Sequence, residues 1–80
     1  MAGTLRQRGL VRQWKLLRAL QAARLGLTWG ELIEAADERV HKRTIYRDID
    51  TLTFAGFPID VESKQGGEST RIVLRERVLH

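Results

Sequence analysis

The chain of 80 residues contains no cysteine, which excludes disulfide bonds and thiolate metal sites. Its apolar runs are only a few residues long, whereas a membrane-spanning helix needs about 20 consecutive apolar residues. The N-terminus has arginines but no apolar segment behind them, so it does not read as a secretory signal. These absences predict a cytoplasmic protein.

Acidic residues are missing from the first 30 positions, which hold six basic ones. The formal net charge of the whole chain is +4, which favours a polyanionic partner. We therefore predict a basic N-terminal arm at residues 1–9, although a short basic tail that is merely solvated would give the same composition. One domain of this size buries roughly 60% of its unfolded surface, which leaves little room for an enclosed catalytic cavity.

Apolar spacing predicts two helices in the first half of the chain. The first runs from about Leu10 to Leu25 with a wide apolar face, and Gly26 ends it in a left-handed turn. The second begins with a capping box, in which the Thr28 side chain and Glu31 each accept a backbone N–H of the other residue.

A third helix runs to about Ala55, where Gly56 terminates it and Pro58 prevents its resumption. Its apolar residues recur at spacings of four and three, as Ile45, Ile49 and Leu52. This seam predicts a helix that is buried on one side.

After the proline the pattern changes to the alternation of two strands, "PIDVESK" and "TRIVLRE", joined by a "QGGE" turn. The residues predicted to face inward are Ile59, Val61, Ile72 and Leu74. Arg71 and Arg75 are predicted to face outward. Three helices followed by a hairpin predict an α+β fold, a winged helix-turn-helix at residues 10–75, with residues 76–80 as a C-terminal tail or linker stub.

The first turns of the third helix carry the cations Lys42, Arg43 and Arg47. Arg43, Thr44 and Arg47 share a face roughly opposite the apolar seam. Since a helix N-terminus favours anions and arginine forks onto guanine in the major groove, this face predicts contact with DNA. The alternative is a solvated face with internal ion pairs to Asp48 or Asp50, but it does not explain why the three cations precede both acids.

The stretch "RTIYRDIDTL" resembles the recognition-helix signature of the WYL-domain transcriptional regulators and the broader DeoR-type winged helices. "LLRAL", "ELIEAA" and "AGFPI" match the spacing of their DNA-binding domain, so the resemblance covers roughly residues 12–74. It implies that Arg43, Thr44 and Arg47 enter the major groove and that Tyr46 supports backbone contact. The hairpin would touch the flanking minor groove or phosphates.

Two departures from this family are apparent. His41 stands where a serine usually precedes the third helix, and the missing cap should cost ~1 kcal/mol unless His41 itself contacts phosphate. The family normally carries a ligand-sensing domain after the wing, whereas this chain ends at His80, so it is either an excised DNA-binding domain or a stand-alone protein.

Lys64 and Arg71 flank the hairpin turn, where they would meet the DNA backbone. The predicted DNA-binding residues are thus His41, Lys42, Arg43, Thr44, Tyr46, Arg47, Lys64 and Arg71. The predicted function is sequence-specific binding of double-stranded DNA by a transcriptional regulator, as a homodimer on a repeated or palindromic site. We expect no membrane partner, no cofactor and no small-molecule site within this chain.

No constellation of residues supports catalysis or a metal site. Asp48 and Asp50 point to different faces, and Asp48 is expected to anchor the third helix by pairing with a cation such as Arg18 on the first helix. Trp14 and Trp29 are expected to pack in or beside the core, and Trp14 could also meet a second subunit. The alternative function is a protein–protein interaction module. RNA binding is less favoured than either, because the sequence shows no exposed aromatic cluster on which bases could stack.

Overall fold

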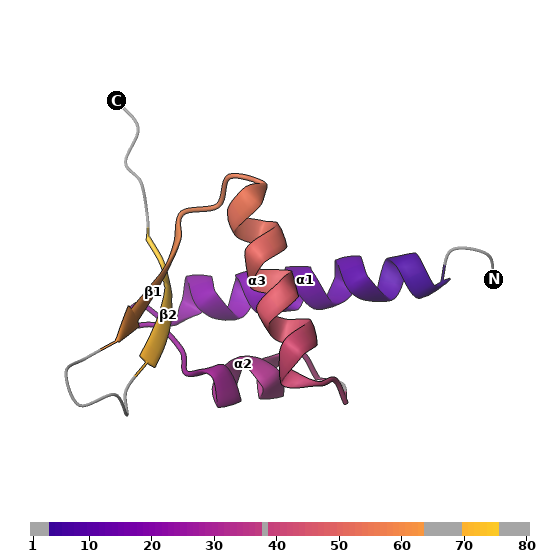
Figure 1. Cartoon of the computed structure of the whole chain (residues 1–80), viewed down its shortest axis with the longest axis horizontal. Coiled ribbons are helices and arrows are strands. Elements are labelled where there is room, and N and C mark those ends of the chain that lie inside the picture. The colour runs from indigo at the N-terminus through magenta and orange to yellow at the C-terminus, as the bar shows by residue number, and fades with distance from the viewer. Residues whose placement is uncertain (1–3, 38, 64–69, 76–80) are drawn as a thin grey trace.

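The computed structural model describes residues 4–37, 39–63 and 70–75, with side chains from residue 8 onward. The elements are α1 (Thr4–Ala22), α2 (Trp29–Ala35), α3 (Lys42–Phe54), β1 (Ile59–Ser63) and β2 (Thr70–Leu74). In Figure 1, α3 crosses α1, α2 lies at the N-terminal end of α3, and the hairpin stands at the opposite end of the molecule from the start of α1. This order confirms the predicted α+β class and the winged helix-turn-helix arrangement.

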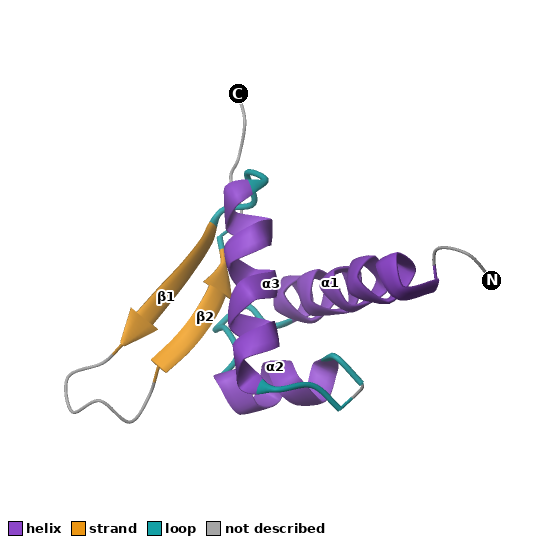
Figure 2. Ribbon diagram, turned by 45° about the vertical axis from the view of Figure 1, so that its right-hand side comes forward, coloured by secondary structure: helices purple, strands orange, loops and turns teal. Residues whose placement is uncertain are grey.

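The first helix differs from its prediction at both ends. It begins at Thr4, within the predicted basic arm, and ends at Ala22 instead of about Leu25. The start of α1 projects beyond the other elements in Figures 1 and 2. Leu10 and Trp14, further along the helix, stay 56% and 55% exposed. Only part of the apolar face is buried, and of the two positions expected for Trp14 it takes the one beside the core, next to Leu17 and Leu52.

The capping box at the start of α2 is confirmed. Thr28 Oγ1 accepts the backbone N–H of Glu31 at 3.1 Å, and Glu31 Oε1 accepts the backbone N–H of Thr28 at 2.9 Å. The hydrogen bond from the Thr28 backbone is the main reason that the pKa of Glu31 lies below its usual value, and the charge of Arg71 lowers it further. The small stabilisation from this bond is therefore present above the usual glutamate pKa and is lost as the pH falls.

The third helix follows its prediction closely. Ile45, Ile49 and Leu52 are buried in the core, and Gly56 adopts a φ of 113° just beyond the C-cap. His41 occupies the N-cap position without a side-chain hydrogen bond, as its identity predicted. The remaining buried members of the core come from the other elements: Leu16, Leu20, Leu32, Ala36, Ile59 and Ile72. None of the described helices combines the length and the apolar character that crossing a membrane requires.

The hairpin is antiparallel, but its burial differs from the prediction. Leu27 and Ile72 exchange two backbone hydrogen bonds, of 2.9 and 2.7 Å, on the edge of β2 away from β1. Because β2 thus lies between two neighbours, Val73 is buried as well as Ile72. β1 is an edge strand, so only Ile59 reaches the core and Val61, which was predicted to face inward, is 55% exposed.

Candidate nucleic-acid interface

The side of α3 opposite its buried seam is exposed and begins with cations. Residues at spacings of four, three and four form this stripe: Arg43, Arg47, Asp50 and Phe54. Lys42 and His41 are exposed beside its N-terminal end, and Thr44 is half-buried at its margin. The helix therefore presents the predicted arginines to solvent, at the end that the helix dipole makes favourable for anions. We call this stripe, with Lys42, the α3 face.

The cations of the α3 face are not neutralised by the rest of the domain. Within the part of the chain that the structure describes, Lys42, Arg43 and Arg47 make no ion pair. Asp48 is buried and turned towards α1, and Asp50 forms no ion pair with them either. The internal pairs on which the solvated-face alternative depends are therefore missing among these residues, and the positive charge is available to a partner.

Asp48 anchors α3 to α1, but through a different partner from the one predicted. The guanidinium of Arg12 donates to both carboxylate oxygens, with 3.1 Å between Nη2 and Oδ1, and Gln13 Nε2 donates to Oδ1 at 3.1 Å. Arg18, the expected partner, is exposed on the solvent side of α1. Because Arg12 and Asp48 are 15% and 5% exposed, this ion pair fixes the rotation of α3 about its axis and hence the direction of the α3 face.

Tyr46 packs against Trp29 of α2. Their ring centroids are 4.4 Å apart with an interplanar angle of 68°, an edge-on contact, and Tyr46 remains 40% exposed. The packing expected for Trp29 against the core is confirmed. The pairing with Tyr46 was missed, since nothing in the spacing of two aromatic residues on separate helices indicates that they meet. The contact holds the tyrosine ring at the border of the α3 face.

The hairpin supplies less accessible charge than predicted. Arg71 is half-buried, and its Nη1 donates to the carbonyl oxygen of Gly26 at 3.4 Å, so the outward orientation expected for this side chain holds only in part. Lys64 lies outside the described residues. Arg75 faces outward as predicted and forms ion pairs with Asp60 and Glu62 of the neighbouring strand.

No cluster of three or more histidine or acidic side chains in the described ranges could hold a metal ion. A family model described as an HTH domain matches residues 12–68, more than half of the chain. The matched segment runs from α1 through α2, α3 and β1. No curated protein and no solved structure is significantly similar to the chain.

Proposed function

Because the chain belongs to the helix-turn-helix domain family, whose members bind DNA, we propose that it binds specific sequences of double-stranded DNA as a transcriptional regulator. In this proposal α3 enters the major groove and the hairpin lies along the flanking backbone. The protein acts as a homodimer on paired half-sites, and the "RTIYRDIDTL" stretch relates it to the WYL-domain, DeoR-type regulators.

The observation that carries the proposal is the α3 face itself. Arg43 and Arg47 lie one turn apart, both exposed and without an ion pair among the described residues. The major groove is about 12 Å wide and admits a helix, whose arginine forks can pair with guanine O6 and N7. Lys42 and His41 flank this stripe, where they can reach phosphates. Exposure, charge and helix position thus agree with one mode of binding.

A protein–protein interaction module is the second candidate function, and Phe54 is the observation that favours it. This side chain is 95% exposed and continues the stripe of Arg43 and Arg47 towards the C-terminal end of α3. A protein partner could cover Phe54 while pairing with the arginines. Base readout distinguishes the two functions, because a protein partner would give no preference among duplexes.

Alanine at Arg43 or at Arg47 should weaken specific binding without unfolding the domain. If either guanidinium forks onto a guanine, its loss should cost ~1–3 kcal/mol on the preferred duplex and weaken the preference at one base position. The unfolding free energy should change by less than about 0.5 kcal/mol, because both side chains are exposed. Anisotropy titrations on a duplex selected from a random library and on a scrambled duplex measure the affinity and the base preference. Thermal melting of the same variants measures the change in stability.

Arg24→Ala is the matched control, since this arginine is also exposed but lies beyond the end of α1. It should leave base preference unchanged. Were the Arg43→Ala and Arg47→Ala variants to melt normally and bind both duplexes like the parent, α3 would not be the reading helix, and the protein-interaction function would be preferred.

The hairpin should add affinity without base preference. Replacing both Lys64 and Arg71 with alanine should weaken binding to every duplex about equally and reduce the slope of log K against log salt by roughly two, one unit for each lost phosphate contact. Because Arg71 is half-buried, thermal melting of the double variant is needed beside the titrations. Unchanged affinity at every salt concentration would show that the hairpin does not touch DNA.

A further inference from the structure

An apolar hollow of about 210 Å³ lies between α1 and the C-terminal end of α3. From α1 it is lined by Leu10, Trp14 and Leu17; from the other side it is lined by Leu52, Ala55 and Phe57. Three of these side chains remain substantially exposed, with Leu10 at 56%, Trp14 at 55% and Phe57 at 37%. A contiguous apolar patch of this kind on a small domain marks an interaction site more often than isolated exposed residues do.

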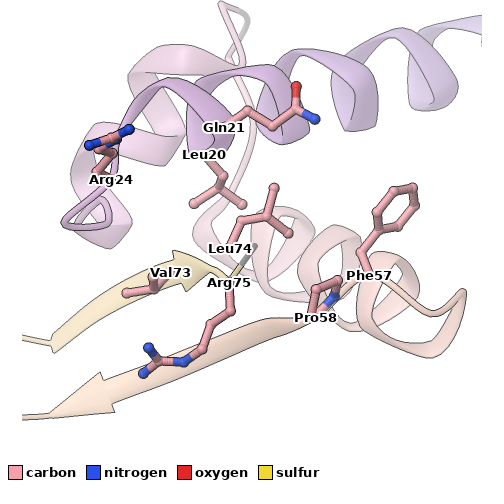
Figure 3. A pocket seen from close by; sticks show the side chains of 8 residues that line it. All are labelled: Leu20, Gln21, Arg24, Phe57, Pro58, Val73, Leu74 and Arg75. Carbon is pink, nitrogen blue, oxygen red and sulfur yellow. The ribbon is translucent and has the colours of Figure 1, made fainter. Parts of the chain in front are cut away.

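A second hollow, of about 610 Å³, adjoins the first one along the same side of α1, and Phe57 lies between them, since it lines both. Figure 3 shows Leu20 of α1 and Leu74 of β2 at its centre, with Arg24 towards one end and Phe57 at the other. Together the two hollows form one groove beside α1, which we call the α1 groove. Its Trp14 end is apolar and its Arg24 end is cationic.

The unpaired charges around the α1 groove are positive. No acidic residue lines either hollow, and α1 has no acidic residue along its whole length. Arg18 lies one turn beyond Trp14, and both Arg18 and Arg24 are exposed without an ion pair among the described residues. Arg75, the other cation of the groove, is already paired with acids of β1.

This charge argues against a second copy of the chain as the occupant. A two-fold contact through α1 would place its arginines opposite one another with no acid on either helix, and like charges in an interface are unfavourable. An apolar stripe flanked by carboxylates on the partner would complement both the apolar lining of the groove and its positive charge. A helix meets this requirement with apolar residues at spacings of three and four.

We propose that the α1 groove binds an amphipathic acidic helix of another protein. Its apolar side chains enter the hollow at Trp14 and Phe57, and its carboxylates pair with Arg18 and Arg24. None of the residues proposed to contact DNA lines either hollow. A protein carrying such a helix could therefore be recruited while the α3 face is on its duplex.

The test uses the full chain and a designed helical peptide of about 15 residues, with leucines at spacings of three and four and glutamates on both sides of this stripe. A second peptide has lysine in place of each glutamate. Calorimetric titration should show binding of the glutamate peptide, weakened by added salt, and no binding of the lysine peptide. Absence of binding by the glutamate peptide, or equal binding of both, would overturn the proposal.

Two pairs of variants locate the binding site. Trp14→Ala should lower the affinity for the glutamate peptide by roughly tenfold, as expected for an aromatic anchor, whereas Val11→Ala should leave this affinity unchanged. Val11 is 49% exposed on the same helix and lines neither hollow, so it is the matched control. The double variant with Arg18→Glu and Arg24→Glu should no longer bind the glutamate peptide, while the Arg8→Glu variant should still bind it. Equal affinities within either pair would place the binding site elsewhere.

Sedimentation equilibrium of the chain alone tests whether a second copy of the chain occupies the groove instead. A dimer that is lost in Trp14→Ala but kept in Val11→Ala would show that a second copy fills the α1 groove, and the proposal would fail. DNA titrations of Trp14→Ala should match the parent, so that failure of the groove proposal and failure of DNA binding are distinguishable. A parallel loss of DNA affinity in this variant would contradict the independence of the two surfaces.

Discussion

Replacement of Asp48 by alanine should destabilise the domain by about 3–5 kcal/mol, the cost of breaking a buried ion pair by removing one partner. Asp48 is the buried acid of α3, and it accepts hydrogen bonds from Arg12 and from Gln13 of α1. Its loss removes the carboxylate that the largely buried guanidinium of Arg12 faces. Because a domain of this size has a total stability of only about 5 kcal/mol, much of the population should unfold.

Denaturant unfolding of three variants checks this expectation. Asp50→Ala is the control: it also removes a carboxylate, but Asp50 lies two residues after Asp48 and is exposed. This variant should change the unfolding free energy by less than about 0.5 kcal/mol. The double variant Arg12→Met with Asp48→Leu should recover most of the lost stability, since apolar residues of similar volume often replace a buried ion pair without loss. An Asp48→Ala variant as stable as Asp50→Ala would show that the ion pair does not hold α3 in place.

Alanine at Gly26 should cost about 3–5 kcal/mol, from backbone strain and overpacking together. Gly26 has a φ of 91°, and an added Cβ would lie 2.7 Å from Val73 Cγ2 and 2.8 Å from the carbonyl oxygen of Ile72. That oxygen accepts the backbone N–H of Leu27. Room for the methyl group can therefore be made only by disturbing the bridge that connects α1 and α2 to the hairpin.

Gly56→Ala separates the two causes. Gly56 has a φ of 113°, but no heavy atom lies within 4 Å of its added Cβ. It should therefore show only the strain of an unfavourable backbone conformation, about 1–3 kcal/mol. Thermal and denaturant unfolding of both variants measure the difference, which is the cost of the close contact at Gly26. Equal destabilisation would mean that Val73 and Ile72 move aside freely.

Most of the helical architecture could be predicted from local patterns. The reciprocal hydrogen bonds of Thr28 and Glu31 need only residues three positions apart, so their spacing predicted the start of α2 correctly. The seam of Ile45, Ile49 and Leu52 likewise needs only helical periodicity to place it on one side of α3. The same periodicity put Arg43 and Arg47 opposite this seam, as the structure has them.

Predictions that depended on a distant neighbour were less successful. Asp48 was expected to be an anchor, but its partner is Arg12 instead of Arg18, since the rotation of α1 against α3 decides which cation comes within reach. Val61 was expected to face inward but is exposed, whereas Val73 is buried, because the bridge from Leu27 makes β2 the inner strand and leaves β1 at the edge. Alternation along a strand cannot indicate which strand will be covered on both sides.

The sequence by itself therefore determined the helices, the turn to a hairpin and the cationic face of α3, because each depends on residues within a few positions of one another. The tertiary structure alone decided which apolar residues are buried and which form the α1 groove. Trp14 shows the difference: its spacing places it with the leucines of α1, yet it stays 55% exposed at the margin of the hollow between α1 and the C-terminal end of α3. Burial is a property of the neighbours that an element meets, and the pattern within one segment does not contain them.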